Sequence, residues 1–160
     1  KVAHELIAFT DIHYGRQQAN LAHECGDFIL RRSDGVYAYQ LAVVIDDALM
    51  GVNQVVRGCD LLSSTPVQLY LYRLLNLTPP SFCHIPLLTD AAGRRLSKRD
   101  GDLEIAALRQ HYGSPEPIIG LLAYLAGQLP KPEQLTAAEL LPLFRPEKVS
   151  HENIVVPQLL

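Results

Sequence analysis

Apolar residues recur at the spacing of one helix face in the first half of the stretch from Tyr39 to Asp60. They are Leu41, Val44, Ile45, Ala48 and Leu49. Because these positions follow the i, i+3, i+4, i+7, i+8 pattern, they predict a helix, although the β-branched run Val43–Ile45 by itself favours a strand. Gly51 then predicts the end of that helix.

A short buried strand is predicted at Val52–Val56, directly before Arg57 and Gly58. Ligands of open α/β sheets bind outside the carboxyl ends of the strands. An arginine at such an end, followed by a glycine that lets the backbone approach closely, suits an anionic ligand. The stretch alone is equally consistent with an Arg57 that pairs with Asp47 or Asp60.

Three further strands are predicted from alternation, a turn and an apolar run. Asp27–Arg32 alternates as a strand does, and Ser33–Gly35 supplies the turn to a return strand at positions 36–37. Phe82–Leu88 is a buried strand with Pro86 near its end. His84 lies in that run, where we expect a hydrogen-bonded core histidine rather than a ligand contact.

Between these strands, Thr65, Pro66 and Gln68 together predict a capped helix start. Thr65 is the expected N-cap, and Gln68 would complete a capping box. Asn76 lies where a left-handed residue would end the helix.

The last third of the chain is predicted to be a cationic loop followed by helices. Arg94–Gly101 combines four cations, a hydroxyl and a glycine, which suits a polyphosphate and equally well a solvated charged loop. Asp102 is expected to cap a helix to about His111. A helix that starts at Ser114-Pro115 is apolar nearly all round and is predicted to be buried, with the apolar residues Ile118, Ile119, Leu121, Leu122 and Leu125. Thr136–Glu139 forms a second capping box, which begins a helix to about Phe144.

Composition narrows the functional classes. The 160 residues are 48% hydrophobic and 19% charged, with a net charge of −3, so the chain is globular and is not a bulk-charge binder of nucleic acid. No apolar run approaches the length of a membrane span. Cys25, Cys59 and Cys83 stand far apart, which predicts free thiols in a reducing cytoplasm. The start at Lys1, without a methionine, predicts a piece of a longer protein.

Histidines and a cysteine gather in residues 1–26, which raises a metal site as a hypothesis. The residues concerned are His4, His13, His23 and Cys25. Their spacing does not fit a compact zinc site, so we predict no metal ligands in this chain.

Several motifs occur in an order that resembles the class I glutamyl-tRNA synthetases. They are Tyr39, Asp46-Asp47, Gly51, Arg57-Gly58-x-Asp60, Ser64-Thr65-Pro66, His84-x-Pro86-Leu87 and Arg95-Leu-Ser-Lys-Arg99. The last corresponds to the second signature loop of that class, Lys-Met-Ser-Lys-Ser. The resemblance covers essentially the whole chain, most firmly residues 27–128.

Within this family, Ala38–Val44 and Gly58–Pro66 are similar to the branch of glutamyl-Q tRNA(Asp) synthetases. The resemblance implies an enzyme that activates glutamate with ATP and transfers it to queuosine of tRNA(Asp). A glutamyl-tRNA synthetase that charges tRNA(Glu) is the first alternative, and a non-catalytic module that binds nucleotide or tRNA is the second. An unrelated α/β domain with an accidental loop is the third.

The first class signature, His-x-Gly-His, and the cysteine-rich zinc segment of many relatives do not occur in this sequence. The chain therefore resembles the C-terminal half of the enzyme, an α/β fold. The implied parts are the end of the inserted acceptor-side domain (1–33), the second half of the Rossmann-type nucleotide-binding domain (34–94), and the signature loop with a small helical domain (95–160).

The resemblance also implies roles for individual residues. Tyr39 and Arg57 would bind glutamate, and Lys98 would be catalytic by stabilising charge on the phosphates. The ATP-binding loop would be Arg95, Leu96, Ser97, Lys98 and Arg99, and the backbone at Leu87 and Leu88 would line the adenine.

The implied ligands and partners are ATP with Mg²⁺, glutamate and tRNA, and a zinc ion could lie upstream in the parent protein. The implied enzyme is a cytoplasmic monomer that does not bind a membrane. The isolated chain is expected to be inactive, because half of the ATP site would be missing.

In the complete enzyme, we expect Lys98→Ala to lower the rate of adenylate formation far more than it weakens glutamate binding. The lysine ammonium would act on phosphate charge that develops only in the transition state. Glutamate-dependent pyrophosphate exchange measures both quantities. An unchanged exchange rate would remove Lys98 from this role.

Overall fold

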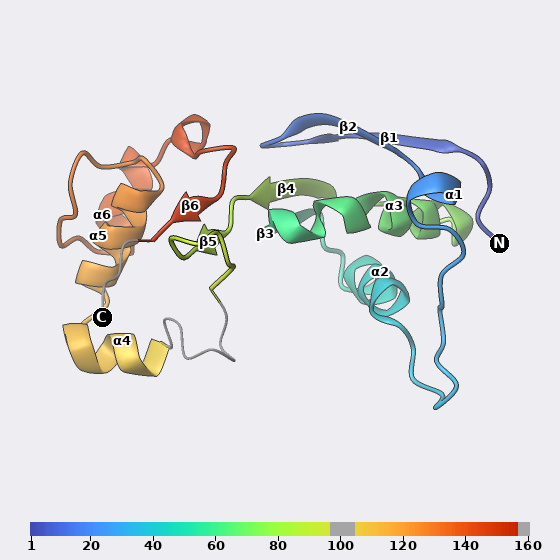
Figure 1. Ribbon diagram of the computed structural model, residues 1–160, viewed down its shortest axis with the longest axis horizontal. Coiled ribbons are helices and arrows are strands. Elements are labelled where there is room, and N and C mark those ends of the chain that lie inside the picture. Colours follow the sequence, from blue (N-terminus) through green and yellow to red (C-terminus); the bar gives the residue numbers. More distant parts are fainter. Residues whose placement is uncertain (97–104, 157–160) are drawn as a thin grey trace. The chain divides into compact units, whose positions relative to one another are not determined.

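The computed structural model describes residues 1–96 and 105–156, which belong to two compact units, Lys1–Ile85 and Pro86–Leu160 (Figure 1). Ser97, Lys98 and Arg99 of the expected ATP loop lie outside the described residues, as does Asp102. The first unit joins the segment 1–33 to most of the segment 34–94. The predicted family-domain boundaries at 33/34 and 94/95 stay predictions.

The first unit opens with an antiparallel hairpin of β1 (Leu6–Asp11) and β2 (Gly15–Asn20), in which Asp11 is opposite Gly15. A short helix, α1 (Leu21–Glu24), follows. This hairpin was not predicted from the sequence. The reason is that β2 is polar and buries only Ala19, so that it lacks the apolar alternation of a strand.

The strand predicted at Asp27–Arg32 is wrong. In this segment the structure has only an isolated bridge between Arg31 and Tyr37, around a turn in which the Gly35 N–H donates to the Arg32 carbonyl. The predicted turn is thus confirmed. In this segment only Phe28 packs against the core, whereas Ile29 is 68% exposed and Leu30 is 39% exposed.

The helix α2 (Tyr39–Leu49) confirms the periodic pattern, with Val44 fully buried and Gly51 in the left-handed region at φ 69°. The next strand, β3 (Gln54–Gly58), begins two residues later than predicted and includes Arg57 and Gly58. It pairs in parallel with β4 (Ser81–Ile85).

Two helices return the chain from β3 to β4: the 3₁₀ helix η1 (Cys59–Ser64) and α3 (Thr65–Leu74). The predicted capping box at Thr65 is wrong, because Thr65 lies inside the helix and the N-cap is Ser64, without a side-chain cap. The Gln68 amide instead donates to the Gln40 side chain at 2.8 Å. Asn76 is left-handed at φ 54°, as predicted.

The core of this unit lies on both sides of α3. On one side, Val67 and Tyr70 of α3 pack with Ile7 of β1. On the other, Leu71 and Tyr72 pack with Val44 of α2. Figure 1 shows the hairpin running along α3, so α3 connects the hairpin to the rest of the unit.

In the second unit, β5 (Leu88–Thr89) pairs in parallel with β6 (Ile154–Val155). The strand predicted at Phe82–Leu88 is therefore divided into β4 and β5 at Pro86, which has no N–H to continue a ladder. The helices are α4 (Ile105–Tyr112), α5 (Glu116–Leu125) and α6 (Ala137–Leu140), with 3₁₀ turns η3 (Leu141–Leu143) and η4 (Pro146–Lys148).

The capping box of Thr136 and Glu139 is confirmed at the start of α6. The prediction that the helix starting at Ser114-Pro115 is buried nearly all round by its large side chains is wrong for α5. Its buried residues are Gly120 and Ala123, whereas Leu122 is 46% exposed. A Cβ at Gly120 would lie 1.5 Å from the Glu133 carbonyl oxygen, so the glycine lets another segment cross the helix closely.

Within residues 1–96 and 105–156, no helix combines the length and the apolar character that a membrane crossing needs.

Candidate functional site around Arg57

The parallel register of β3 and β4 places Arg57 directly opposite His84. Phe82 lies two residues before His84 on β4 and therefore shares its face of the sheet. The Arg57 Cζ atom is 5.1 Å from the Phe82 ring centroid, and the His84 ring stacks on the same phenyl ring at 6.2 Å and 16°. Phe82 thus supports both polar side chains.

Arg57 is half-buried and donates hydrogen bonds to three different elements. Its Nε–H donates to His84 Nε2 of β4 at 3.0 Å. Its Nη2 donates to Thr65 Oγ1 of α3 at 2.8 Å and, more weakly, to the Leu61 carbonyl of η1 at 3.4 Å. These acceptors hold the guanidinium from one side, and none of them is the carboxylate of Asp47 or Asp60 that the strand end alone suggested.

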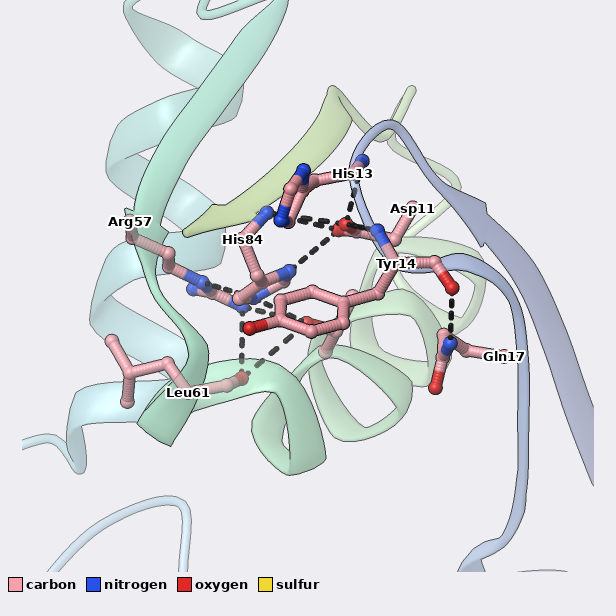
Figure 2. A network of polar contacts seen from close by, with 8 residues as sticks. Asp11, His13, Tyr14, Gln17, Arg57, Leu61 and His84 are labelled. Carbon is pink, nitrogen blue, oxygen red and sulfur yellow. Dashed lines mark hydrogen bonds and ion pairs between the residues drawn. The ribbon is translucent and has the colours of Figure 1, made fainter. Parts of the chain in front are cut away.

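Asp11, the last residue of β1, completes the network from the hairpin (Figure 2). One carboxylate oxygen accepts the backbone N–H groups of His13 at 3.0 Å and Tyr14 at 2.8 Å. The other is 2.6 Å from His84 Nδ1 and also accepts the His84 backbone N–H at 3.1 Å. The Asp11 and His84 side chains are both fully buried.

The chemistry of the partners fixes the proton positions on His84. An arginine Nε–H can only donate, so His84 Nε2 must be the unprotonated, accepting nitrogen. The ring proton then resides on Nδ1 and is donated to the Asp11 carboxylate. A neutral imidazole therefore separates a buried carboxylate from a half-buried guanidinium.

Burial and hydrogen bonding act in opposite directions on the charged ends. Burial alone would raise the pKa of Asp11, but donors from Tyr14, His84 and His13 outweigh burial and lower that pKa. Burial lowers the pKa of Arg57, and the nearby Tyr39 hydroxyl and acidic groups oppose this. Both groups remain charged near neutral pH.

Tyr39 is the first residue of α2 and is 56% exposed. The helix α2 that begins at Tyr39 and the strand β3 that carries Arg57 belong to the same compact unit, so the two residues expected to bind the amino acid are carried by one unit. Their binding roles stay predictions.

The other expected site residues lie in the second unit or outside the described residues. The Leu87 N–H donates to the Asn153 side chain and its carbonyl accepts from Ile154, so this backbone is already hydrogen-bonded. The Leu88 carbonyl accepts from the Leu96 N–H. Arg95 forms an isolated antiparallel β-bridge with Thr89. The convergence of Arg57 and Lys98 on one cleft stays a prediction.

The structure also identifies residues that the sequence analysis missed. His84 is the core histidine that was expected, but its link to Arg57 was not foreseen. Asp11 was not singled out at all, and Thr65 was expected only as a helix cap and not as a partner of Arg57. A signal for Asp11 exists, because an aspartate that begins a turn commonly accepts nearby N–H groups, and Gly15 closes this turn at φ 70°. No three His, Cys, Asp or Glu side chains of the described residues are grouped as a metal site.

Comparison with known proteins relates this geometry to a family. The family model "tRNA synthetases class I (E and Q), catalytic domain" matches residues 2–155. A glutamyl-Q tRNA(Asp) synthetase of Symbiobacterium thermophilum is 48% identical over 153 residues, covering 96% of this chain. The corresponding protein of Nitratidesulfovibrio vulgaris is 58% identical over 125 residues, covering 78% of this chain.

Among solved structures, a glutamate-tRNA synthetase from Elizabethkingia anophelis superposes with a TM-score of 0.77 over 98% of this chain, at 25% identity. A glutamate tRNA ligase from Elizabethkingia meningosepticum, solved in complex with its amino acid, has a TM-score of 0.74 at 26% identity. The chain spans 47% and 39% of the length of the two glutamyl-Q relatives and 35% and 34% of the two solved chains.

We expect Asp11→Asn to remove a pH-dependent part of the stability. The Asp11 pKa lies below its usual 3.8 in the fold, so the ionised carboxylate stabilises the protein above that value. This contribution is lost as the pH falls below 3.8. At about pH 7 the free energy of unfolding of the variant should be about 2–4 kcal/mol lower than that of the parent, and the difference should shrink in acid.

Urea denaturation followed by circular dichroism over a pH series measures this difference. Asp34→Asn is the matched control, because Asp34 pairs with Arg32 on the surface and should contribute less than about 1 kcal/mol. Equal effects of the two substitutions at neutral pH would contradict the buried role of Asp11.

Proposed function

Because this chain belongs to the class I tRNA synthetases of the E and Q group, of which it carries part of the catalytic domain, we propose that it forms the glutamate-binding part of a synthetase. That enzyme would activate glutamate with ATP and transfer it to queuosine of tRNA(Asp). The names of the relatives at 48% and 58% identity support the choice of acceptor.

The observation that carries the proposal is the state of the Arg57 guanidinium. Its Nε and Nη2 are engaged by His84 and Thr65, whereas Nη1 donates no hydrogen bond to any residue of the described ranges. A charged donor that is anchored on one side and available on the other suits a carboxylate. Tyr39, at the start of α2 in the same unit, is proposed to offer a hydroxyl to the same ligand.

The proposed reaction has two steps. A glutamate carboxylate oxygen attacks the α-phosphorus of ATP, and the bond to pyrophosphate breaks, which gives glutamyl-adenylate. An acceptor hydroxyl of the tRNA then attacks the activated carbonyl and releases AMP. Arg57 and Tyr39 contribute by holding the amino acid in a fixed orientation, which lowers the entropic part of the barrier.

The phosphate chemistry is assigned to the signature loop, with Lys98 as the cation that stabilises the pentavalent phosphorus. ATP would enter as its Mg²⁺ complex, with the phosphates as metal ligands. The main chain around Leu87 and Leu88 is proposed to line the adenine by van der Waals contact, because the Leu87 N–H, the Leu87 carbonyl and the Leu88 carbonyl already have hydrogen-bond partners.

Location and assembly follow from the same proposal. Cys25, Cys59 and Cys83 are free thiols, which supports a reducing compartment such as the cytoplasm. We further propose that the complete enzyme is a monomer.

Arg57→Lys in a full-length synthetase that contains this sequence should raise the glutamate concentration needed for half-maximal pyrophosphate exchange about 10–100-fold. A lysine ammonium cannot keep the anchoring bonds and also present a second planar N–H pair. Arg73→Lys is the matched control, because Arg73 pairs with Glu5 on the surface of the same unit. A normal glutamate titration for Arg57→Lys would remove Arg57 from the binding site.

The acceptor is tested with labelled glutamate and three tRNAs: tRNA(Asp) with queuosine, the same tRNA without it, and tRNA(Glu). We expect label only on the first. Label on tRNA(Glu) alone would support the second candidate, a glutamyl-tRNA synthetase, which the structural similarity at a TM-score of 0.77 favours. Label on none of them, with exchange intact, would contradict both acceptors.

A further inference from the structure

We propose that Asp11 and His84 are positioning residues, which fix the orientation of the Arg57 guanidinium for its carboxylate ligand. This inference rests on the proposed function, since it assigns to Arg57 the side-chain carboxylate of glutamate. Neither residue would contact the ligand, because both side chains are fully buried.

The direction of the Arg57 guanidinium is fixed before a ligand binds. An arginine side chain has several rotatable bonds, and each bond that is fixed before the ligand arrives reduces the entropy lost on binding. The Nε–H bond to His84 at 3.0 Å and the Nη2 bond to Thr65 at 2.8 Å fix the plane of the guanidinium. The Phe82 ring, 5.1 Å from Cζ, supports one face of that plane.

The acceptor for the Arg57 Nε–H is Nε2 of His84. Nε2 can accept from Arg57 only while the ring proton is on Nδ1. Asp11 determines this tautomer, because its carboxylate lies 2.6 Å from Nδ1 and has no proton to donate. With the opposite tautomer, an N–H group would face the Arg57 N–H and push the guanidinium away.

The neutral His84 ring separates the charges of Asp11 and Arg57. If Asp11 paired directly with Arg57, a substrate carboxylate would have to displace a protein carboxylate of the same charge. The neutral His84 ring between them gives Arg57 a hydrogen-bond acceptor without placing a negative group in contact with it. Arg57 therefore remains free to bind a carboxylate, while the carboxylate of Asp11 keeps the ring in place.

The Asp11 carboxylate is itself held in place by several hydrogen bonds. Its carboxylate accepts the N–H groups of His13 and Tyr14 within its own turn, and the backbone N–H of His84 on the neighbouring strand. The turn is also joined to β4 by the bond from the Ile12 N–H to the Phe82 carbonyl at 2.8 Å. The carboxylate is thus fixed relative to the strand that carries His84.

Two substitutions at one position separate the positioning role from a structural one. An Asn amide reaches about as far as Nδ1, so His84→Asn keeps a donor for Asp11 and removes the acceptor for Arg57. A Gln amide reaches about as far as Nε2, so His84→Gln keeps that acceptor. Asp11→Asn presents an amide N–H to Nδ1 and favours the wrong tautomer.

In a full-length synthetase that contains this sequence, we expect His84→Asn and Asp11→Asn to raise the KM for glutamate about tenfold or more. The KM for ATP should change less than about twofold, and His84→Gln should remain within about threefold of the parent for glutamate. Equal glutamate KM values for His84→Asn and the parent would overturn the inference. Equal increases for His84→Asn and His84→Gln would also overturn it.

Heteronuclear NMR of the imidazole nitrogens in the unmodified chain provides a second measurement that does not depend on variants that fold poorly. The inference requires the Nδ1–H tautomer of His84 at neutral pH, and the Nε2–H tautomer would overturn it. The outcome for Arg57→Lys separates the two proposals. If that variant binds glutamate normally, the proposed function fails; if it does not, and His84→Asn binds normally, only the positioning role fails.

Discussion

One buried contact, between the Asp11 carboxylate and the His84 imidazole, holds the functional half of the first unit together. Its two atoms are 2.6 Å apart and belong to residues 73 positions apart in the sequence. Burying a carboxylate is costly unless donors surround it, and here backbone N–H groups and the ring supply them. The cost of desolvating Asp11 is therefore offset by a network that also orders Arg57.

This network explains why the hairpin belongs to the same compact unit as the parallel strands. The hairpin contributes Ile7 to the apolar cluster around α3 and Asp11 to the polar cluster around β4. Apolar burial stabilises the unit without fixing directions, whereas the hydrogen bonds determine which atoms face each other. The site around Arg57 thus depends on the hairpin even though no hairpin side chain reaches its free Nη1 edge.

The sequence predicted helices and turns better than strands, and it predicted long-range contacts poorly. The helix α2 and the positive φ of Gly51 follow from spacing and residue type over a few positions, and both are confirmed. The capping box at Thr65 failed because a guanidinium from another element takes the hydroxyl, which a local pattern cannot reveal. The same limit applies to His84: burial was predictable from its apolar neighbours, but its partners were not.

The turn between β1 and β2 has a length that the hairpin ladder alone does not require. The turn places the Asp11 carboxylate against His84 of β4, and the Ile12 N–H donates to the Phe82 carbonyl. The turn therefore contacts a strand outside the hairpin. Surface loops usually tolerate insertions. An added residue here would leave the β1–β2 ladder intact and shift the carboxylate out of register with His84. The length of this turn is therefore set by its contacts with β4 and not by the hairpin alone.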